Sequence, residues 1–193
     1  MRRRAAACGF VSLGGAALLF CLPVSASALE VVAVDTAAES RSIRVELEVV
    51  LDAPMDRVID VLTDYDRIHE LHPRFRDSGD LGSPAPGVTE VYTVFRGCLA
   101  VFCRTVRRVE RLQRTPTGLL AVEVPGRSDF AEGRTEWRFR AEGNQRTRLY
   151  YRAVLEPDFL LPPLFGRRVL AEMTRETTVE MLAAAERVAR GEP

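Results

Sequence analysis

The sequence is poor in several residue types that carry chemistry. Its 193 residues contain no lysine, one tryptophan and two histidines, and its 27 arginines balance 27 acidic residues. A balanced charge argues against nucleic acid as a partner, because nucleic-acid binding calls for a basic patch or stripe. Arginine as the sole basic residue is typical of a GC-rich bacterial genome. No glycine-rich phosphate loop, Ser-His-Asp arrangement or metal cluster is evident, so the sequence predicts no cofactor and no catalytic residue.

The N-terminal 28 residues have the layout of a cleavable secretory signal. Arginines at positions 2–4 precede an almost entirely apolar stretch, Ala5–Leu22, and Ser25–Ala28 ends in a small-residue Ala-x-Ala site. We predict that residues 1–28 are a signal peptide removed after Ala28. The protein is then expected to be periplasmic or secreted in a bacterium.

Two alternatives to a cleaved signal stay open. The segment could remain as an uncleaved anchor, since about 18 apolar residues can just span a bilayer. Cys21 could carry a lipid, although the bulky Phe20 directly before it disfavours this. If the signal is removed, the three N-terminal arginines leave with it, and 24 basic residues remain against 27 acidic ones. The remaining length of about 165 residues suits one domain with a single core.

The remaining chain alternates between strand and helix patterns. Residues 29–40 have no clear period and are interpreted as a short leader before a domain that spans residues 41–190. Between Ile43 and Leu51 apolar and polar residues alternate, which predicts a strand with one buried face. Pro54 then starts a helix, and a second short helix ends at Pro73.

Further strand patterns follow, and the last segment is helical. The strand candidates are Val88–Phe95, Val101–Leu112, Leu119–Val124, Phe130–Arg140 and Arg146–Glu156, and the helix covers about Pro163–Arg190. Consecutive strands joined by short turns make an antiparallel sheet buried on one face, and only the last helix is long enough to cover that face. We therefore predict an α+β fold with a curved antiparallel sheet of six to seven strands around a long C-terminal helix. Two short helices follow the first strand, and an apolar pocket separates sheet from helix.

Short motifs within this order of elements resemble the SRPBCC (START-like) helix-grip superfamily. They are Leu51-Asp-Ala-Pro54, Val61-Leu-Thr-Asp-Tyr-Asp66, Leu71-His-Pro73, and Pro162-Pro163, Glu172 and Thr177-Thr178 around the final helix. The Asp-Tyr-Asp turn and the following Leu-x-Pro are most similar to the branch of polyketide cyclases/dehydrases and ubiquinone-binding proteins. The resemblance implies the helix-grip fold and ligands such as a quinone, a lipid or a polyketide. The superfamily includes carriers, enzymes and binding modules, so it implies no single activity.

Cys98 and Cys103 are the cysteines that remain once Cys8 and Cys21 leave with the signal. On one continuous strand they would point to opposite faces, about 16 Å apart. A hairpin with Leu99–Phe102 as its tip places them opposite each other, at the Cβ separation of about 4 Å that a disulfide needs. We predict this disulfide because the expected compartment is oxidising. The alternative is two buried free thiols on one strand.

The tip of this hairpin is apolar, whereas hairpin turns normally contain Gly, Asn or Asp. This tip contains Leu99, Val101 and Phe102 instead. An apolar tip can pack on the neighbouring helices as part of the core, cover the mouth of the pocket, contact a membrane surface or bind a protein partner. The sequence leaves peripheral membrane contact open and identifies no protein partner.

Two groups of polar residues are candidates for a site. His69 and His72 lie three positions apart without a third ligand, and they are interpreted as solvated side chains at a helix end. The strand arginines are interpreted as the wet outer face of the sheet, paired with glutamates on neighbouring strands. If the register of one strand is reversed, an arginine faces the pocket instead and can bind an anionic ligand group. The arginines are Arg104, Arg108, Arg138, Arg140, Arg148 and Arg152, the glutamates are Glu110, Glu123 and Glu136, and Glu90, Tyr92, Tyr150 and Asp129 are further groups that could reach the interior.

The predicted function is the binding or transport of a hydrophobic small molecule or lipid in the pocket. The residues expected to line the pocket are Tyr92, Trp137, Phe139, Tyr151, Phe165, Val169 and Met173. One alternative is an enzyme similar to polyketide cyclases/dehydrases. Another is a non-catalytic interaction protein of the cell envelope that uses the Leu99–Phe102 tip as its contact.

Overall fold

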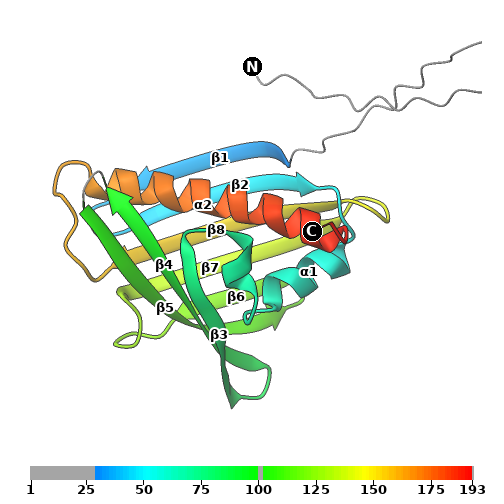
Figure 1. Ribbon diagram of the computed structural model, residues 1–193, viewed down its shortest axis with the longest axis horizontal. Coiled ribbons are helices and arrows are strands. Elements are labelled where there is room, and N and C mark those ends of the chain that lie inside the picture. The colour runs from blue at the N-terminus through cyan, green and yellow to red at the C-terminus, as the bar shows by residue number, and fades with distance from the viewer. Residues whose placement is uncertain (1–28, 100–101, 193) are drawn as a thin grey trace, which may run out of the picture.

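One antiparallel sheet and one long helix make up most of the fold (Figure 1). The computed structural model describes residues 29–99 and 102–192. The strands are β1 (Glu30–Ala38), β2 (Ile43–Leu51), β3 (Phe75–Ala85), β4 (Val88–Leu99), β5 (Phe102–Thr115), β6 (Gly118–Glu123), β7 (Phe130–Ala141) and β8 (Thr147–Pro157), and the helices are α1 (Met55–Thr63), the 3₁₀ helix η1 (Ile68–Leu71) and α2 (Gly166–Ala189). The eight strands lie in the order β1-β2-β8-β7-β6-β5-β4-β3, and α2 runs along one face of the sheet (Figure 1). The predicted α+β helix-grip fold is confirmed, with eight strands instead of six to seven.

The two edge strands, β1 and β3, are the ones the sequence pattern missed. Strand β1 lies within residues 29–40, which were interpreted as a leader, and it is exposed along nearly its whole length. It pairs with β2 on one side only, so neither of its faces needs to be apolar and no alternation is visible. In β3 the pairing with β4 is interrupted by irregularities between Phe75 and Asp77 and on either side of Gly82. Such bulges break the two-residue period.

The predicted helices are present with small shifts at their ends. Helix α1 begins at Met55, directly after Pro54. Helix α2 begins at Gly166 and ends at Ala189, slightly shorter than the predicted Pro163–Arg190. No helix within residues 29–99 and 102–192 has the length and apolarity needed to span a membrane. The predicted signal peptide, residues 1–28, lies outside the described residues.

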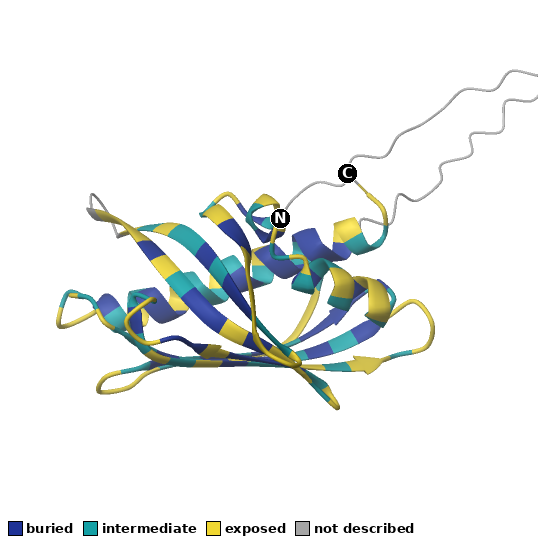
Figure 2. Cartoon of the chain, turned by 90° about the horizontal axis from the view of Figure 1, so that it is seen from below, coloured by how far each residue is buried: buried dark blue, intermediate teal, exposed yellow. Residues whose placement is uncertain are grey.

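The core is most tightly closed around the C-terminal half of α2. Leu182 and Ala185 of this half are fully buried and belong to one core cluster with buried residues of β2 and β8. Figure 2 shows the buried parts of α2 in dark blue. The carboxylate of Glu186, itself only 2% exposed, accepts a hydrogen bond from the amide of Asp52 at 3.1 Å. The hydroxyl of Thr147 donates to the carbonyl of Ala53 at 2.8 Å. We call this region the closed end.

The β4–β5 hairpin lies at the opposite end of the sheet (Figure 1). Its pairing sets Cys98 opposite Cys103, and the two sulfur atoms are joined in a disulfide with a length of 2.07 Å. The backbones of Leu99 and Phe102 pair with each other, as the hairpin interpretation requires. The side chains of Leu99 and Phe102, together with residues 100–101, lie outside the described residues. The role predicted for this apolar tip therefore stays a prediction.

Candidate ligand-binding cavity

Between Leu170 and Met181, helix α2 covers a cavity of about 110 Å³, which we call the inner chamber. Helix α2 presents one face to it, with residues spaced three or four apart: Leu170, Met173, Thr174, Thr177, Thr178 and Met181. Sheet strands form the opposite wall, and Leu62, Tyr65 and Ile68 of the α1–η1 region border one side. Since successive strand residues alternate between faces, each strand contributes every second residue, as Thr93 and Phe95 of β4 show.

A second cavity of about 400 Å³, the outer chamber, lies next to the inner one toward the hairpin end. Phe95, Leu170 and Met173 line both chambers, so the two chambers are adjacent. The other lining residues are Gly97, Cys103, Arg104, Val106, Phe159, Leu160, Leu161, Pro162, Gly166 and Val169. Arg104 is the charged member of this set. The outer chamber is therefore an apolar passage bordered by the disulfide hairpin and by the loop from β8 to α2.

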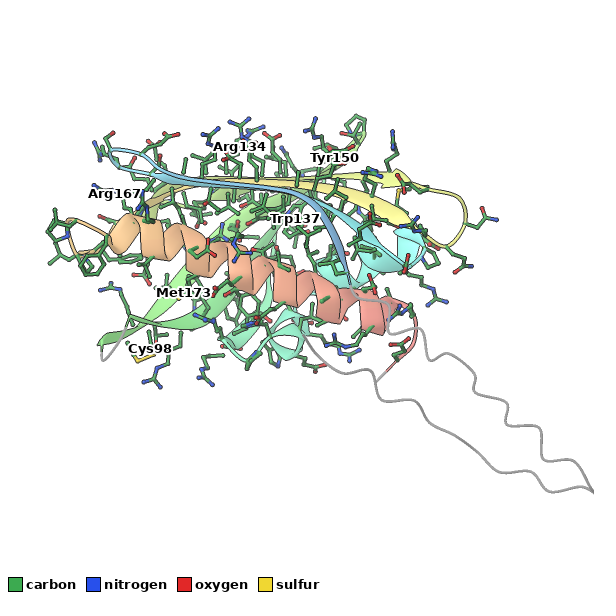
Figure 3. All side chains as sticks on the ribbon, turned by 90° about the horizontal axis from the view of Figure 1, so that it is seen from above. Cys98, Arg134, Trp137, Tyr150, Arg167 and Met173 are labelled. Atoms are coloured by element: carbon green, nitrogen blue, oxygen red, sulfur yellow. A yellow bond between two sulfur atoms is a disulfide. The ribbon has the colours of Figure 1, made fainter. Side chains whose placement is uncertain are left out.

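Four of the seven predicted lining residues do border these chambers. Trp137, Tyr151 and Met173 line the inner chamber, and Val169 and Met173 line the outer one. The rings of Trp137 and Tyr151 pack edge to face with centroids 4.5 Å apart, which fixes their orientation on neighbouring strands. In Figure 3 Trp137 lies on the helix side of the sheet, whereas Arg134 and Tyr150 lie on the outer side.

The other three predicted lining residues lie elsewhere. Tyr92 points to the outer face of β4, where the guanidinium of Arg107 lies 4.5 Å from its ring centroid, because its neighbours Val91 and Thr93 take the inner face. Phe139 packs into the core beside the chambers without lining either one. Phe165 immediately precedes α2 and is 51% exposed. The strand register and the helix start, both inferred from sequence, are the origin of these errors.

A cluster of charged side chains lies against the wall of the inner chamber. The guanidinium of Arg108 donates to Glu123 at 2.6 Å and to Glu110 at 2.7 Å, and it lies 3.3 Å from the hydroxyl of Thr135. Glu110 and Glu123 are each 5% exposed. Arg108, Glu110 and Thr135 line the inner chamber, and Glu123 lies behind them. This is the site's main polar feature.

The strand pairing explains why the cluster needs its arginine. Glu110 of β5 is directly opposite Glu123 of β6, and like charges in such a pair repel. Arg108 lies two residues before Glu110, hence on the same face, and bridges both carboxylates. Gly133 of β7 leaves room for this arrangement, because a Cβ there would lie 2.2 Å from Cγ of Glu123.

Burial shapes the protonation of this cluster. Burial raises the pKa of Glu110 to about 7, Arg108 opposes this shift, and Glu123 adds to it. Burial disfavours the charge on Arg108, but the two carboxylates outweigh it and raise its pKa, so the guanidinium stays protonated. The pKa values of Tyr65 and Tyr151 are raised, mainly by burial, so both phenols are neutral. The chamber wall thus presents a carboxyl group that can gain or lose a proton near neutral pH.

Arg108, Glu110 and Glu123 correct the expectation that the strand arginines and their partners all lie on the wet outer face. The outer-face interpretation does hold for Arg148, which pairs with Glu48 and Glu142, and for Arg152, which lies 3.3 Å from Glu46. The doublet Arg107-Arg108 was the signal that could have revealed the cluster. Adjacent residues of a strand point to opposite faces, so one of these arginines has to face inward.

The further polar candidates also lie away from the chambers. Glu90 pairs with Arg127 on the outer side of β4. Asp129 accepts a hydrogen bond from the amide of Arg107 at 2.7 Å. The ring of Tyr150 lies under the guanidinium of Arg138 at 5.6 Å. Each of these groups has a structural partner on the outer surface.

His72 is buried, which corrects its interpretation as a solvated side chain. It is 4% exposed; its Nδ1 accepts the amide proton of Arg74 at 3.0 Å, and its Nε2 lies 2.7 Å from the carboxylate of Glu180. Because Nδ1 accepts, the proton of the neutral ring is on Nε2, which donates to Glu180. This bond ties the segment after η1 to α2 beside the inner chamber. Among the described residues, no group of three or more His, Cys, Asp or Glu side chains could hold a metal ion.

Comparison with known families agrees with this geometry. Residues 42–190 match the family described as polyketide cyclase / dehydrase and lipid transport. The chain belongs to this family, and the predicted membership of the helix-grip superfamily is confirmed. No curated protein sequence matches the chain.

Several solved structures share the fold. The Zhui aromatase/cyclase from Streptomyces sp. R1128 has a TM-score of 0.63 and 19% identity, covering 77% of this chain and 94% of that one. A START superfamily protein from Mycobacterium smegmatis has a TM-score of 0.60 and 13% identity, with coverage of 77% and 97%. A STAR-related lipid transfer protein from Xanthomonas axonopodis has a TM-score of 0.58 and 16% identity, with coverage of 80% and 98%. At these identities the likeness shows the fold alone.

Proposed function

We propose that the protein binds a hydrophobic small molecule or lipid in the two chambers beneath α2. The observation that carries the proposal is an apolar outer chamber directly beside an inner chamber whose wall contains the Arg108 cluster. Apolar walls supply affinity by removing ligand surface from water, and a few placed polar groups orient the ligand. The family's lipid-transport members and the lipid transfer protein from Xanthomonas axonopodis support the same class of ligand.

The charges of the cluster limit which polar groups of a ligand can bind in the inner chamber. Arg108 is already shared between two carboxylates, so an anionic ligand group would face Glu110 as well as the guanidinium. With Glu110 protonated, one positive and one negative charge remain, and the cluster is neutral. A neutral hydroxyl or carbonyl group can exchange hydrogen bonds with Glu110, Thr135 and Arg108 without adding an uncompensated buried charge. We therefore favour an amphiphile with a neutral polar end.

Native mass spectrometry of protein purified from its own host tests this proposal. The expected result is a population of molecules heavier than the polypeptide by the mass of an organic ligand that organic solvent extracts. A spectrum of bare polypeptide, combined with no fluorescence gain from the apolar probe N-phenyl-1-naphthylamine, would reject it. A bare polypeptide in stable complex with another protein would favour the envelope interaction protein instead.

Glu110 is the observation that supports a second candidate, an acid–base enzyme of the cyclase/dehydrase kind. A buried carboxyl group with a pKa of about 7 on the wall of the inner chamber can accept a proton from a carbon beside a carbonyl and return one to a departing hydroxyl, which leaves as water. The Zhui aromatase/cyclase shares the fold. Incubation with a poly-β-ketone substrate should then give a dehydrated product that Glu110→Gln fails to form while still binding the apolar probe. Equal turnover by Glu110→Gln would exclude this candidate.

A further inference from the structure

The loop between β8 and α2 displays apolar side chains beside the outer chamber. Leu160 is 97% exposed, Leu164 95% and Phe165 51%. The other exposed large apolar residues among those described lie between 38% and 46%. Leu160 and Leu164 therefore protrude into solvent to a degree that no other described large apolar residue approaches.

The loop holds these side chains in place, because residues beside and between them anchor it. Phe159 packs edge to face against Phe130, with ring centroids 5.8 Å apart, and Leu161 packs against the main core. The amide of Gly166 donates to the carbonyl of Pro162 at 2.8 Å. A Cβ on Gly166 would lie 2.8 Å from Cβ of Leu161, so a glycine is needed for this close approach. The outward side chains thus belong to a backbone whose conformation is specified.

The segments that border the outer chamber contain more arginines than acidic residues. The segments that border the outer chamber, 95–98, 103–106 and 158–169, contain four arginines and one acid, Asp158: the arginines are Arg96, Arg104, Arg167 and Arg168. Arg104 also lies 3.9 Å from Asp129. Figure 3 places Arg167 in the first turn of α2 and Cys98 on the hairpin at the same end of the molecule.

We propose that a docking face, made of Leu160, Leu164, Phe165, Arg167 and Arg168, binds the surface of a membrane that contains anionic lipids. Separate protruding apolar side chains can each enter the interfacial layer of a bilayer, whereas a folded protein would have to supply a matching pocket for each one. Arginines next to them are attracted to anionic headgroups. On this face the outer chamber opens toward the bilayer. If the proposed function holds, an apolar ligand passes between membrane and cavity without crossing water.

Vesicle sedimentation tests the docking face. The purified protein is mixed with vesicles of phosphatidylcholine, with or without phosphatidylglycerol, and the bound fraction is measured. The test variant is Leu164→Ser/Phe165→Ser, since neither residue lines a chamber. The matched control is Leu81→Ser/Val122→Ser, which removes apolar residues exposed by 41% and 39% elsewhere on the surface. We expect the test variant to lose at least about tenfold in binding to phosphatidylglycerol vesicles, and the control to bind like wild type.

The arginines are tested separately. Arg167→Gln/Arg168→Gln should weaken binding to phosphatidylglycerol vesicles and leave binding to pure phosphatidylcholine unchanged. Wild-type protein that stays in solution with both kinds of vesicle, or a test variant that sediments like wild type, overturns the docking face. So does a dimer in sedimentation velocity that Leu164→Ser/Phe165→Ser dissociates, because the face would then bind a second copy of the chain.

Probe binding in vesicle-free solution separates this inference from the proposed function. The Leu164→Ser/Phe165→Ser variant should bind N-phenyl-1-naphthylamine as wild type does, since the chambers are unchanged. Suppose that the variant loses vesicle binding but that wild type binds no probe. That result would support the docking face and reject the cavity function. If wild type binds the probe but not the vesicles, the result would support the cavity function and reject the docking face.

Discussion

The two halves of α2 pack differently against the sheet. The C-terminal half packs directly against the sheet, with Leu182 and Ala185 fully buried and Glu186 held by the amide of Asp52. The N-terminal half faces a cavity, with Met173 and Thr177 among the side chains that line it, and this lining ends at Met181 shortly after the midpoint. Ala184 and Ala185 are buried at the closed end, whereas Met173 and Thr177 border space that no side chain fills. One helix therefore closes the core at one end and roofs a ligand chamber at the other.

The largest expected effect on the free energy of unfolding comes from a comparison of one residue in each half of α2. Leu182→Ala should lower the free energy of unfolding by about 2–5 kcal/mol, because it leaves a void in a fully packed region. Met173→Ala should cost only about 1 kcal/mol or less, since the residue is half-buried and already faces a cavity. Urea unfolding measures both. Equal losses would mean that the two halves are packed alike.

The Arg108 cluster should make stability depend on pH in an unusual direction. The folded-state pKa of Glu110 is raised to about 7 from 4.5, so above pH 7 the folded state carries the full cost of the buried charge. As the pH falls from 7 toward 4.5, the folded state takes up a proton that the unfolded state does not, and stability increases. Below 4.5 both states are protonated and the gain is complete. The gain is up to about 3 kcal/mol.

Comparison of wild type with Glu110→Gln isolates this effect. Urea unfolding at pH 8 and pH 5.5 should show wild type gaining stability relative to the variant at the lower pH. Contributions from other titrating groups cancel in this difference. The same pH dependence in both proteins would show that Glu110 titrates normally.

The hairpin disulfide should contribute less to the free energy of unfolding than the burial of Leu182 or the protonation of Glu110. Cys98→Ser/Cys103→Ser opens a small ring, so the expected loss is at most about 2 kcal/mol in the free energy of unfolding. Thermal melts of the variant and of wild type give the difference. Intact mass after alkylation of the unreduced protein is the accompanying check. Two alkylated thiols would mean that the bridge does not form in solution.

The smallest effect is expected at the mouth of the cavity. Leu164→Ser should change the free energy of unfolding by no more than about 0.5 kcal/mol, because the side chain is 95% exposed. The same urea experiment applies. A large loss of stability would place Leu164 in a packed contact and would remove the reason to assign it to membrane docking.

The sequence pattern predicted the strands that have one buried and one exposed face. It did not predict strands whose two faces are alike. Strand β2 shows its alternation between Ile43 and Leu51 because one face is core and the other is wet. Strand β1 shows none, since it is exposed on both faces. The inward position of Arg108 could not be read from alternation alone, because Arg107 beside it is an equally polar residue. Its place depends on the register of β5 against β6, which a single chain's pattern does not specify.

Within the site, the predicted residues that border the chambers lie on regular elements. Trp137 and Tyr151 face each other across β7 and β8, and Met173 follows the helical spacing of α2. Phe165 failed because the helix begins one residue after it, so helical spacing does not apply there. Tyr92 failed because the aromatic residue occupies the outer face of β4, where Arg107 covers it.

The central claim, that a ligand occupies the space between sheet and α2, is tested most directly by filling that space. Ala121 of β6 is 2% exposed and lines the inner chamber, whereas its neighbour Val122 points outward and is 39% exposed. Ala121→Phe, and independently Thr177→Phe on the helix wall, should weaken the binding of N-phenyl-1-naphthylamine by at least about tenfold, while Val122→Phe should not change it. Equal affinity in wild type and all three variants would contradict the account.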